Sequence, residues 1–141
     1  MAGEAVLIIE TALPIAMECV NATAIPKGSV LKITDPFTAG LAAGDEDDVA
    51  GIAAEEKIAS DGKTKIAVYR RGIFKMLAQG NITAGQAVST SAATGATINN
   101  VAAATKTSQG SQTLGLTLEN AGDEETLLVE LNIGCTTNAY S

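Results

Sequence analysis

GKTKIAVYRRGIFKML, residues 62–77, is the densest strand-forming stretch of this chain. Apolar and polar side chains alternate along it, which is the period-two pattern of a strand with one buried face. The apolar parity holds Ile66, Val68, Phe74 and Met76. Gly72 interrupts the centre, where a strand uses glycine only if the chain bends, bulges or passes close to another backbone. The stretch therefore predicts one long central strand with a kink at Gly72.

The same stretch contains five of the nine basic residues and two of the four aromatic residues. Elsewhere the sequence is rich in glycine, alanine and threonine, which predicts a core of small aliphatic side chains. A chain of 141 residues is long enough for one domain with a buried core and too short for two. The sequence has no histidine, so the commonest general base and metal ligand is missing.

Residues that carry chemistry do not gather into a recognisable motif. Serine and threonine are plentiful, but no histidine activates them and spacing locates no lysine dyad. The acidic run at residues 45–48 does not make a calcium loop, because that pattern would place its third alternating carboxylate at Val49 and its sixth-position glycine at Ala50. Cys19 and Cys135 alone cannot enclose zinc, and they are either free buried thiols or a disulfide. We therefore expect no enzyme activity, no cofactor and no metal.

The charge of the chain bears on its partners. A net charge of −7 repels phosphate backbones and anionic bilayers, so we expect neither a nucleic acid nor a membrane as partner. Basic residues cluster within residues 57–75, and acidic ones within residues 45–48 and 123–125. These patches either meet between copies of the molecule or are solvated loops.

The N-terminal segment has an apolar run, AVLII at residues 5–9, between Glu4 and Glu10. With those flanks and no preceding basic residue, the run predicts neither a signal peptide nor a membrane span. We expect an arm over residues 1–17 and a single β-barrel domain over residues 18–141. The arm either binds a partner or a neighbouring copy, or forms an edge strand of its own barrel.

Turn signals separate short strand patterns along the rest of the chain. We expect strands near residues 15–20, 29–34, 49–53, 63–77, 86–90, 96–99, 113–118 and 126–133. Residues 38–48 are expected to form a loop, and residues 91–112 a low-complexity insert. About seven or eight short strands with no convincing helix predict an all-β barrel or sandwich.

Two pairs of motifs indicate an internal duplication. IPKGSVL at residues 25–31 resembles ITAGQAV at residues 82–88, and AGIAAE at residues 50–55 resembles LGLTLE at residues 114–119. Each half reads as a turn, a strand, a loop, a glycine-containing strand, a turn and a long strand. Two such halves are expected to close into one pseudo-symmetric barrel.

The order and spacing of these motifs resemble those of the small capsid decoration, or head cement, proteins of tailed bacteriophages. The resemblance covers roughly residues 12–133 and rests on IPKGSV at residues 25–30, VAGIA at 49–53, RGIF at 71–74, ITAGQAV at 82–88 and TLGLTLE at 113–119, followed by LVEL at 128–131. It implies a non-enzymatic β-barrel protein that is made in the host cytoplasm and binds the outer surface of the virion capsid. It also implies the major capsid protein as partner, stabilisation of the shell, and a homotrimer.

The interaction surface is predicted from two parts of the chain. The apolar residues of the N-terminal segment are expected to contact the capsid or a neighbouring subunit, and the polar face of the central strand is expected to meet an acidic surface. The residues are Val6, Leu7, Ile8, Ile9, Leu13, Tyr69, Arg70, Arg71 and Lys75.

Two other function classes fit the sequence less well. A host- or carbohydrate-binding β module is disfavoured because sugar platforms depend on aromatic faces, and aromatics are only 3% of this chain. A biotinyl or lipoyl carrier domain is faintly resembled by SDGK at residues 60–63, but Gly62 separates Asp61 from Lys63.

Overall fold

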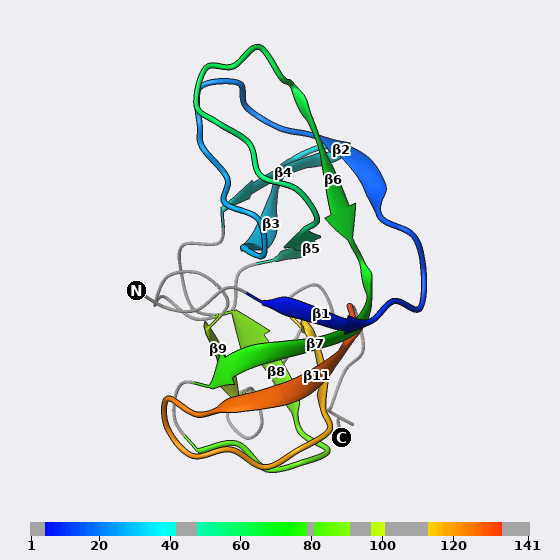
Figure 1. Cartoon of the computed structure of the whole chain (residues 1–141), viewed down its shortest axis with the longest axis vertical. Coiled ribbons are helices and arrows are strands. Elements are labelled where there is room, and N and C mark those ends of the chain that lie inside the picture. The colour runs from blue at the N-terminus through cyan, green and yellow to red at the C-terminus, as the bar shows by residue number, and fades with distance from the viewer. Residues whose placement is uncertain (1–4, 42–47, 79–80, 91–96, 101–112, 134–141) are drawn as a thin grey trace.

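The computed structural model describes residues 5–41, 48–78, 81–90, 97–100 and 113–133. These residues form eleven strands and no helix, so the all-β class is confirmed (Figure 1). The strands are β1 (Val6–Ile9), β2 (Ile15–Glu18), β3 (Val30–Asp35), β4 (Thr38–Leu41), β5 (Val49–Ala53), β6 (Lys65–Tyr69), β7 (Arg71–Ala78), β8 (Ala87–Thr90), β9 (Thr97–Asn100), β10 (Gly115–Thr117) and β11 (Thr126–Asn132).

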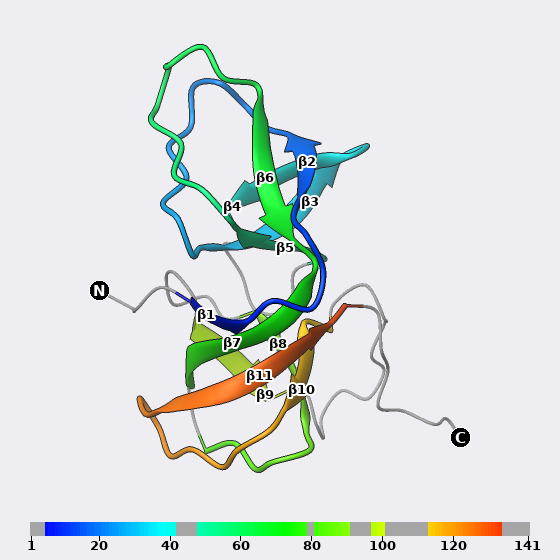
Figure 2. The ribbon, with the colours of Figure 1, turned by 45° about the vertical axis from the view of Figure 1, so that its right-hand side comes forward.

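The strands belong to two sheets. β2, β4, β3, β5 and β6 close into a small barrel, and the other sheet has the order β1-β7-β11-β10-β8-β9. An additional pairing of β9 with β7 links the last strand of the second sheet back to its second strand. Figure 2 shows the barrel above the second sheet, with the chain passing from β6 directly into β7.

Each sheet encloses apolar side chains, and the two sheets also pack on each other. The barrel interior contains Met17, Leu31, Ile66 and Val68, all buried. The second core is larger and includes Phe74, Met76, Leu114, Leu127 and Val129. Val30, Val49 and Ile52 of the barrel belong to this second core, so apolar burial continues across the boundary between the sheets.

The predicted long central strand is two strands in different sheets. β6 ends at Tyr69 in the barrel and β7 begins at Arg71 in the second sheet. The chain changes sheet at Arg70, whose Nη1 donates to the Ala50 carbonyl oxygen at 2.9 Å. Gly72 has φ = 139°, and an added Cβ there would lie 3.3 Å from the Ile9 carbonyl oxygen. The glycine therefore marks a close approach to β1, one of the predicted uses.

The duplication is visible in the strand pairings. The barrel pairs β2 with β6, β6 with β5, β5 with β3, and β3 with β4, all antiparallel, and β2 with β4 parallel. The second sheet repeats this pattern with β7, β11, β10, β8 and β9, including the parallel pair of β7 with β9. The sequence suggested that both halves close one barrel; instead each half builds its own sheet.

The turns repeat as well. Ile25 and Lys57 exchange two backbone hydrogen bonds of 2.9 and 2.8 Å, and Ile82 and Ala121 exchange two of 2.8 Å. Gly28 and Gly85, three residues further along in each half, have φ of 83° and 86°. A left-handed backbone of this kind is open to glycine at no steric cost. The IPKG and ITAG motifs therefore build the same turn twice.

The N-terminal segment contributes to both sheets. β1 pairs antiparallel with β7, and β2 is a strand of the barrel. The sequence left open whether this segment is a binding arm or an edge strand. In the structure β1 is the edge strand of the second sheet. The expected boundary between arm and barrel at residue 17 falls inside β2, and the division into domains stays a prediction.

Other differences from the sequence expectations are local. The expected loop over residues 38–48 begins with strand β4, which pairs with β3 through a tight hairpin, and residues 42–47 lie outside the described residues. Within residues 91–112 only β9 is described. Cys19 is a buried free thiol, whereas Cys135 lies outside the described residues, so a pairing of the two is not tested.

Candidate interaction surface

The two predicted parts of the surface lie side by side. β1 runs antiparallel to β7, with Val6 opposite Lys75, Leu7 opposite Phe74 and, after a bulge, Ile9 opposite Ile73. Cross-strand partners share a face of a sheet, so the N-terminal apolar residues and the basic residues of β7 are neighbours. Residues more than sixty positions apart in the sequence therefore form one surface.

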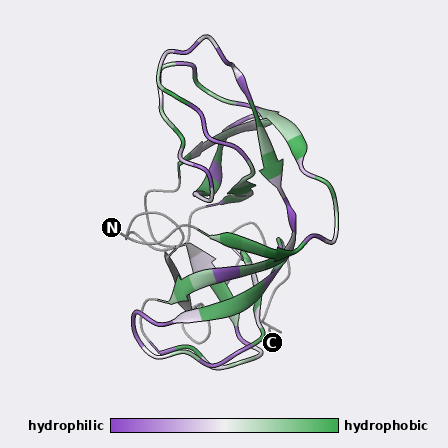
Figure 3. Cartoon of the chain, in the orientation of Figure 1, coloured by the Kyte–Doolittle hydropathy of each residue, from purple (hydrophilic) through white to green (hydrophobic). Residues whose placement is uncertain are grey.

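We call this surface the outer sheet face. It consists of the outward side chains of β1, β7 and β11, namely Val6, Ile9, Arg71, Ile73, Lys75, Leu77, Leu128 and Glu130. Val6, Lys75 and Leu128 form one row across the three strands, and Ile9, Ile73 and Glu130 form the next. Figure 3 shows hydrophobic colour along these strands, interrupted by a hydrophilic segment in β7.

The outer sheet face combines exposed apolar area with a net positive charge, since the two cations Arg71 and Lys75 outnumber the carboxylate of Glu130. Val6 is 48% exposed and Ile9 is 52% exposed, while Ile73, Leu77 and Leu128 are partly buried. Lys75 is exposed and has no ion pair among the described residues. Such a surface gains free energy when it is covered, because apolar area leaves water and the cation meets a carboxylate.

Three of the predicted residues lie beside this face or under it. Leu7 points inward and packs against the second core, so it supports β1 from below. Ile8 is exposed at the bulge of β1, and Leu13 is exposed in the link between β1 and β2. Leu7 is therefore a structural residue, and the accessible part of the N-terminal segment is Val6, Ile8, Ile9 and Leu13.

Tyr69 and Arg70 are engaged where the chain changes sheet. The Tyr69 hydroxyl donates to Glu10 Oε2 at 2.9 Å, and this hydrogen bond raises the pKa of the hydroxyl above its ordinary value. The Tyr69 ring meets Phe74 edge-on, with ring centroids 5.6 Å apart. Arg70 is occupied by the Ala50 carbonyl oxygen. These two side chains hold the two sheets together more than they offer a binding surface.

Arg71 remains on the accessible side. Its Nη1 donates to Asn132 Oδ1 at 2.7 Å, which links β7 to β11. A guanidinium has five N–H donors, so this single bond leaves donors for a partner. Arg71 and Lys75 are thus the two cations of the outer sheet face.

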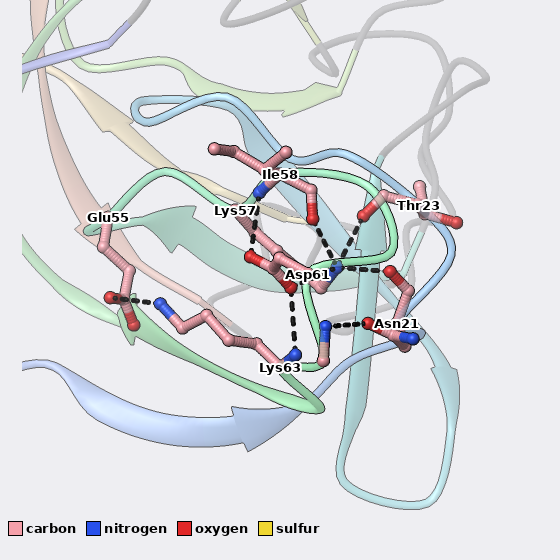
Figure 4. A network of polar contacts seen from close by, with 8 residues as sticks. Asn21, Thr23, Glu55, Lys57, Ile58, Asp61 and Lys63 are labelled. Carbon is pink, nitrogen blue, oxygen red and sulfur yellow. Dashed lines mark hydrogen bonds and ion pairs between the residues drawn. The ribbon is translucent and has the colours of Figure 1, made fainter.

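A buried lysine is one of two features that the sequence did not reveal. Lys57 is fully buried, and its Nζ donates to the carbonyl oxygens of Asn21 at 2.6 Å, Thr23 at 3.1 Å and Ile58 at 3.1 Å (Figure 4). Asp61 Oδ1 lies 3.5 Å from the same nitrogen. The ammonium therefore ties together the loops before β3 and before β6. Its N–H donors are taken up by these contacts within the fold.

Groups suited to chemistry are sparse in the described part of the chain. Among those residues no cluster of three or more His, Cys, Asp or Glu side chains is arranged to hold a metal ion. The same residues include no helix that is long and apolar enough to cross a membrane.

Comparison with known proteins decides the family. A family model described as phage cement protein matches residues 9–133, which is most of the chain. The chain belongs to the phage cement protein family. This cement protein is thereby associated with a phage capsid, and its family is structural and not one of enzymes.

A solved structure with a similar fold covers most of the cement protein. The crystal structure of the head fiber gp8.5 N base in bacteriophage phi29 matches with a TM-score of 0.53 and 13% sequence identity, covering 89% of this chain and 98% of that chain. At this identity the likeness shows the fold alone. No curated protein sequence matches the cement protein.

Proposed function

We propose that this cement protein binds the outer surface of an assembled tailed-phage capsid as a homotrimer, contacts the major capsid protein and stabilises the shell. The observation that carries the proposal, beyond the family itself, is the outer sheet face. The pairing of β1 with β7 places exposed Val6 and Ile9 next to Lys75. We infer that this face is buried when the trimer occupies the capsid.

The physical chemistry favours binding to a lattice. The contact of one subunit with the shell is expected to be weak, because association costs translational and rotational freedom. Linked subunits bind several sites at once, and avidity then exceeds the affinity of one contact by orders of magnitude. A protein that binds the assembled shell and not its free subunits also stabilises the shell by mass action.

The similar solved structure supports a place on the phage head. It is described as the N base of a head fiber, and it matches both halves of this chain. The duplicated β fold is thus found in a second protein named for the phage head. It supports the proposal only through the fold, since the sequences are 13% identical.

Cosedimentation with capsids tests the proposal. The wild-type protein is expected to pellet with assembled shells that lack it and to stay in the supernatant with unassembled major capsid protein. The double variant Val6→Asp, Lys75→Glu should lose most of the bound protein while keeping its melting temperature. The double variant Val20→Asp, Lys27→Glu is the matched control, since it makes the same charge change at two exposed residues outside the outer sheet face. Failure of the wild-type protein to pellet with shells would contradict the proposal.

A further inference from the structure

The hairpin between β3 and β4 holds an aromatic side chain in an unfavourable backbone. Asp35 pairs with Thr38, which leaves Pro36 and Phe37 as the central residues of the turn. Phe37 has φ = 51° and is 58% exposed. Proline at the first central position and a positive φ at the second define a type II turn, which prefers glycine where Phe37 stands.

Two preferences of the fold are therefore violated at Phe37. Two-residue hairpins favour the mirror-image turn types, whose twist matches that of the strands. A bulky side chain in the left-handed region is a genuine outlier, and such strain tends to accompany function. Phe37 is also the one exposed aromatic side chain among the described residues. The Phe37 carbonyl oxygen accepts from the Glu18 amide at 3.0 Å, which gives the backbone of the turn a role but does not call for an aromatic side chain. A binding role does, because aromatics are enriched at interfaces.

The surroundings of Phe37 indicate what it binds. Asp35 is exposed at the same turn and has no ion pair among the described residues, and Ile33 on the same strand is exposed. The tip of the β3–β4 hairpin thus presents the Phe37 ring and the Ile33 side chain next to the negative charge of Asp35. Its complement is an apolar surface with a cation.

The outer sheet face has that chemistry. Val6 and Ile9 offer apolar area, with Lys75 directly beside Val6. Among the other described lysines, Lys57 is buried, and Lys63 and Lys65 form ion pairs. Lys27 and Lys32 form no ion pair among the described residues, but Lys27 lies outside the strands and Lys32 is opposite Gly40 and the buried Val49, so neither is opposite an exposed apolar strand residue as Lys75 is. The tip belongs to the barrel and the outer sheet face to the other sheet (Figure 2), so we take the two surfaces to meet between copies.

We propose that the β3–β4 hairpin of one copy docks on the outer sheet face of the next copy, with Phe37 against Val6 and Ile9 and with Asp35 facing Lys75. Two different patches make this contact, so it is heterologous, and such contacts close into a ring when the rotation between copies permits. A ring of three copies is the homotrimer of the proposed function. This inference rests on that proposal and names its subunit interface.

Removal of the aromatic ring tests the anchor. Phe37→Gly places the preferred residue in the turn, so the melting temperature of the monomer should be unchanged or higher. The trimer dissociation constant, from analytical ultracentrifugation, should rise about thirtyfold or more if Phe37 is a hot spot. Ile58→Thr alters an equally exposed apolar residue and should leave the trimer unchanged. A trimer unaffected by Phe37→Gly would overturn the inference.

A charge exchange tests the pairing. Lys75→Glu and Asp35→Lys should each weaken the trimer by about tenfold, because each places like charges together. The double variant should recover most of the wild-type affinity. A double variant that is as weak as either single one, or weaker, would show that Asp35 and Lys75 do not meet.

Capsid binding separates this inference from the proposed function. The wild-type protein could pellet with shells and yet be monomeric at every concentration, or form a trimer that is unaffected by the Phe37 and Lys75 substitutions. Either result would refute the interface and leave capsid decoration intact. Wild-type trimers that do not pellet with shells refute decoration and leave the interface standing. Trimer loss together with loss of pelleting in Phe37→Gly supports both.

Discussion

Val6 of β1 lies opposite Lys75 of β7, and this single pairing joins the N-terminal apolar segment to the basic face of the central stretch. Within the N-terminal segment, β1 is tied to the fold, because Leu7, next to Val6, packs against the second core. Deletion of residues 1–17 would remove β1 and most of β2, so it would test folding as much as binding. Point substitutions on the outer side of β1 separate the two.

Leu7→Ala should lower the free energy of unfolding by about 2 kcal/mol, because the side chain is partly buried against the second core. Val6→Thr on the opposite face of β1 should change it by less than about 0.5 kcal/mol. Urea denaturation measures both. Equal effects of the two substitutions would contradict the assignment of β1 to the fold.

Gly51→Ala and Gly115→Ala should each destabilise the protein by about 3 kcal/mol. The two glycines occupy matching places in β5 and β10, and an added Cβ would overlap the carbonyl oxygens of Tyr69 and Glu130 respectively. Gly40→Ala is the control, since its Cβ would meet only the Thr34 methyl group at 3.1 Å. Thermal unfolding that shows Gly40→Ala to be as harmful would contradict the close approach.

Lys57→Met should lower the free energy of unfolding by about 3 kcal/mol. Methionine fills much of the volume but leaves the carbonyl oxygens of Asn21, Thr23 and Ile58, whose bonds to Lys57 are partly buried, without their donor, and it leaves Asp61 without its cation; unpaired polar groups shielded from water are costly. Chemical denaturation measures the loss.

The matched control for that variant is Lys63→Met. Lys63 forms an exposed ion pair with Glu55 at 3.2 Å, and such pairs contribute less than about 1 kcal/mol. A loss at Lys57 no larger than the loss at Lys63 would mean that the buried ammonium does not hold the loops.

Glu55 should make stability depend on pH. A hydrogen bond from the Ala67 amide, and secondarily the Lys63 ammonium, lower the pKa of the Glu55 carboxyl below its ordinary value of 4.5. Its contribution is therefore present above the unfolded-state pKa and is lost as pH falls through the lowered folded-state value. Glu55→Gln should melt below wild type at pH 7, and the gap should close between about pH 5 and pH 3.

The neighbouring change Glu56→Gln is the control for this titration. No described hydrogen bond is removed by it, so its melting curve should follow wild type across the same pH range. A gap between Glu55→Gln and wild type that stays constant with pH would rule out the assigned role of the carboxylate.

Local patterns predicted the local structure and not the sheet to which each strand belongs. The alternation through Ile66, Val68, Phe74 and Met76 is genuine, and all four side chains are buried. The first two lie in the barrel core and the last two in the second core, yet the parity runs unbroken through Arg70. A period of two reports that one face is buried, and it does not report which core that face meets.

The residues of the interaction surface could be predicted from the sequence, but their arrangement could not. Exposed apolar residues and cations were found from composition, but the register of β1 on β7, which brings them together, is a long-range pairing. Phe37 was missed because a Pro-Phe turn carries no sign of strain until φ is known. Lys57 was missed because lysine is almost never buried, and the matching residue of the second half is Ala121.

The most direct test of capsid decoration is a cryo-electron microscopy reconstruction of capsids that lack this protein, before and after saturation with it. The account predicts added density on the outer surface, in positions with local three-fold symmetry, into which three copies fit with β3–β4 hairpins on neighbouring outer sheet faces. Absence of added density, or density on the inner surface of the shell, would contradict it.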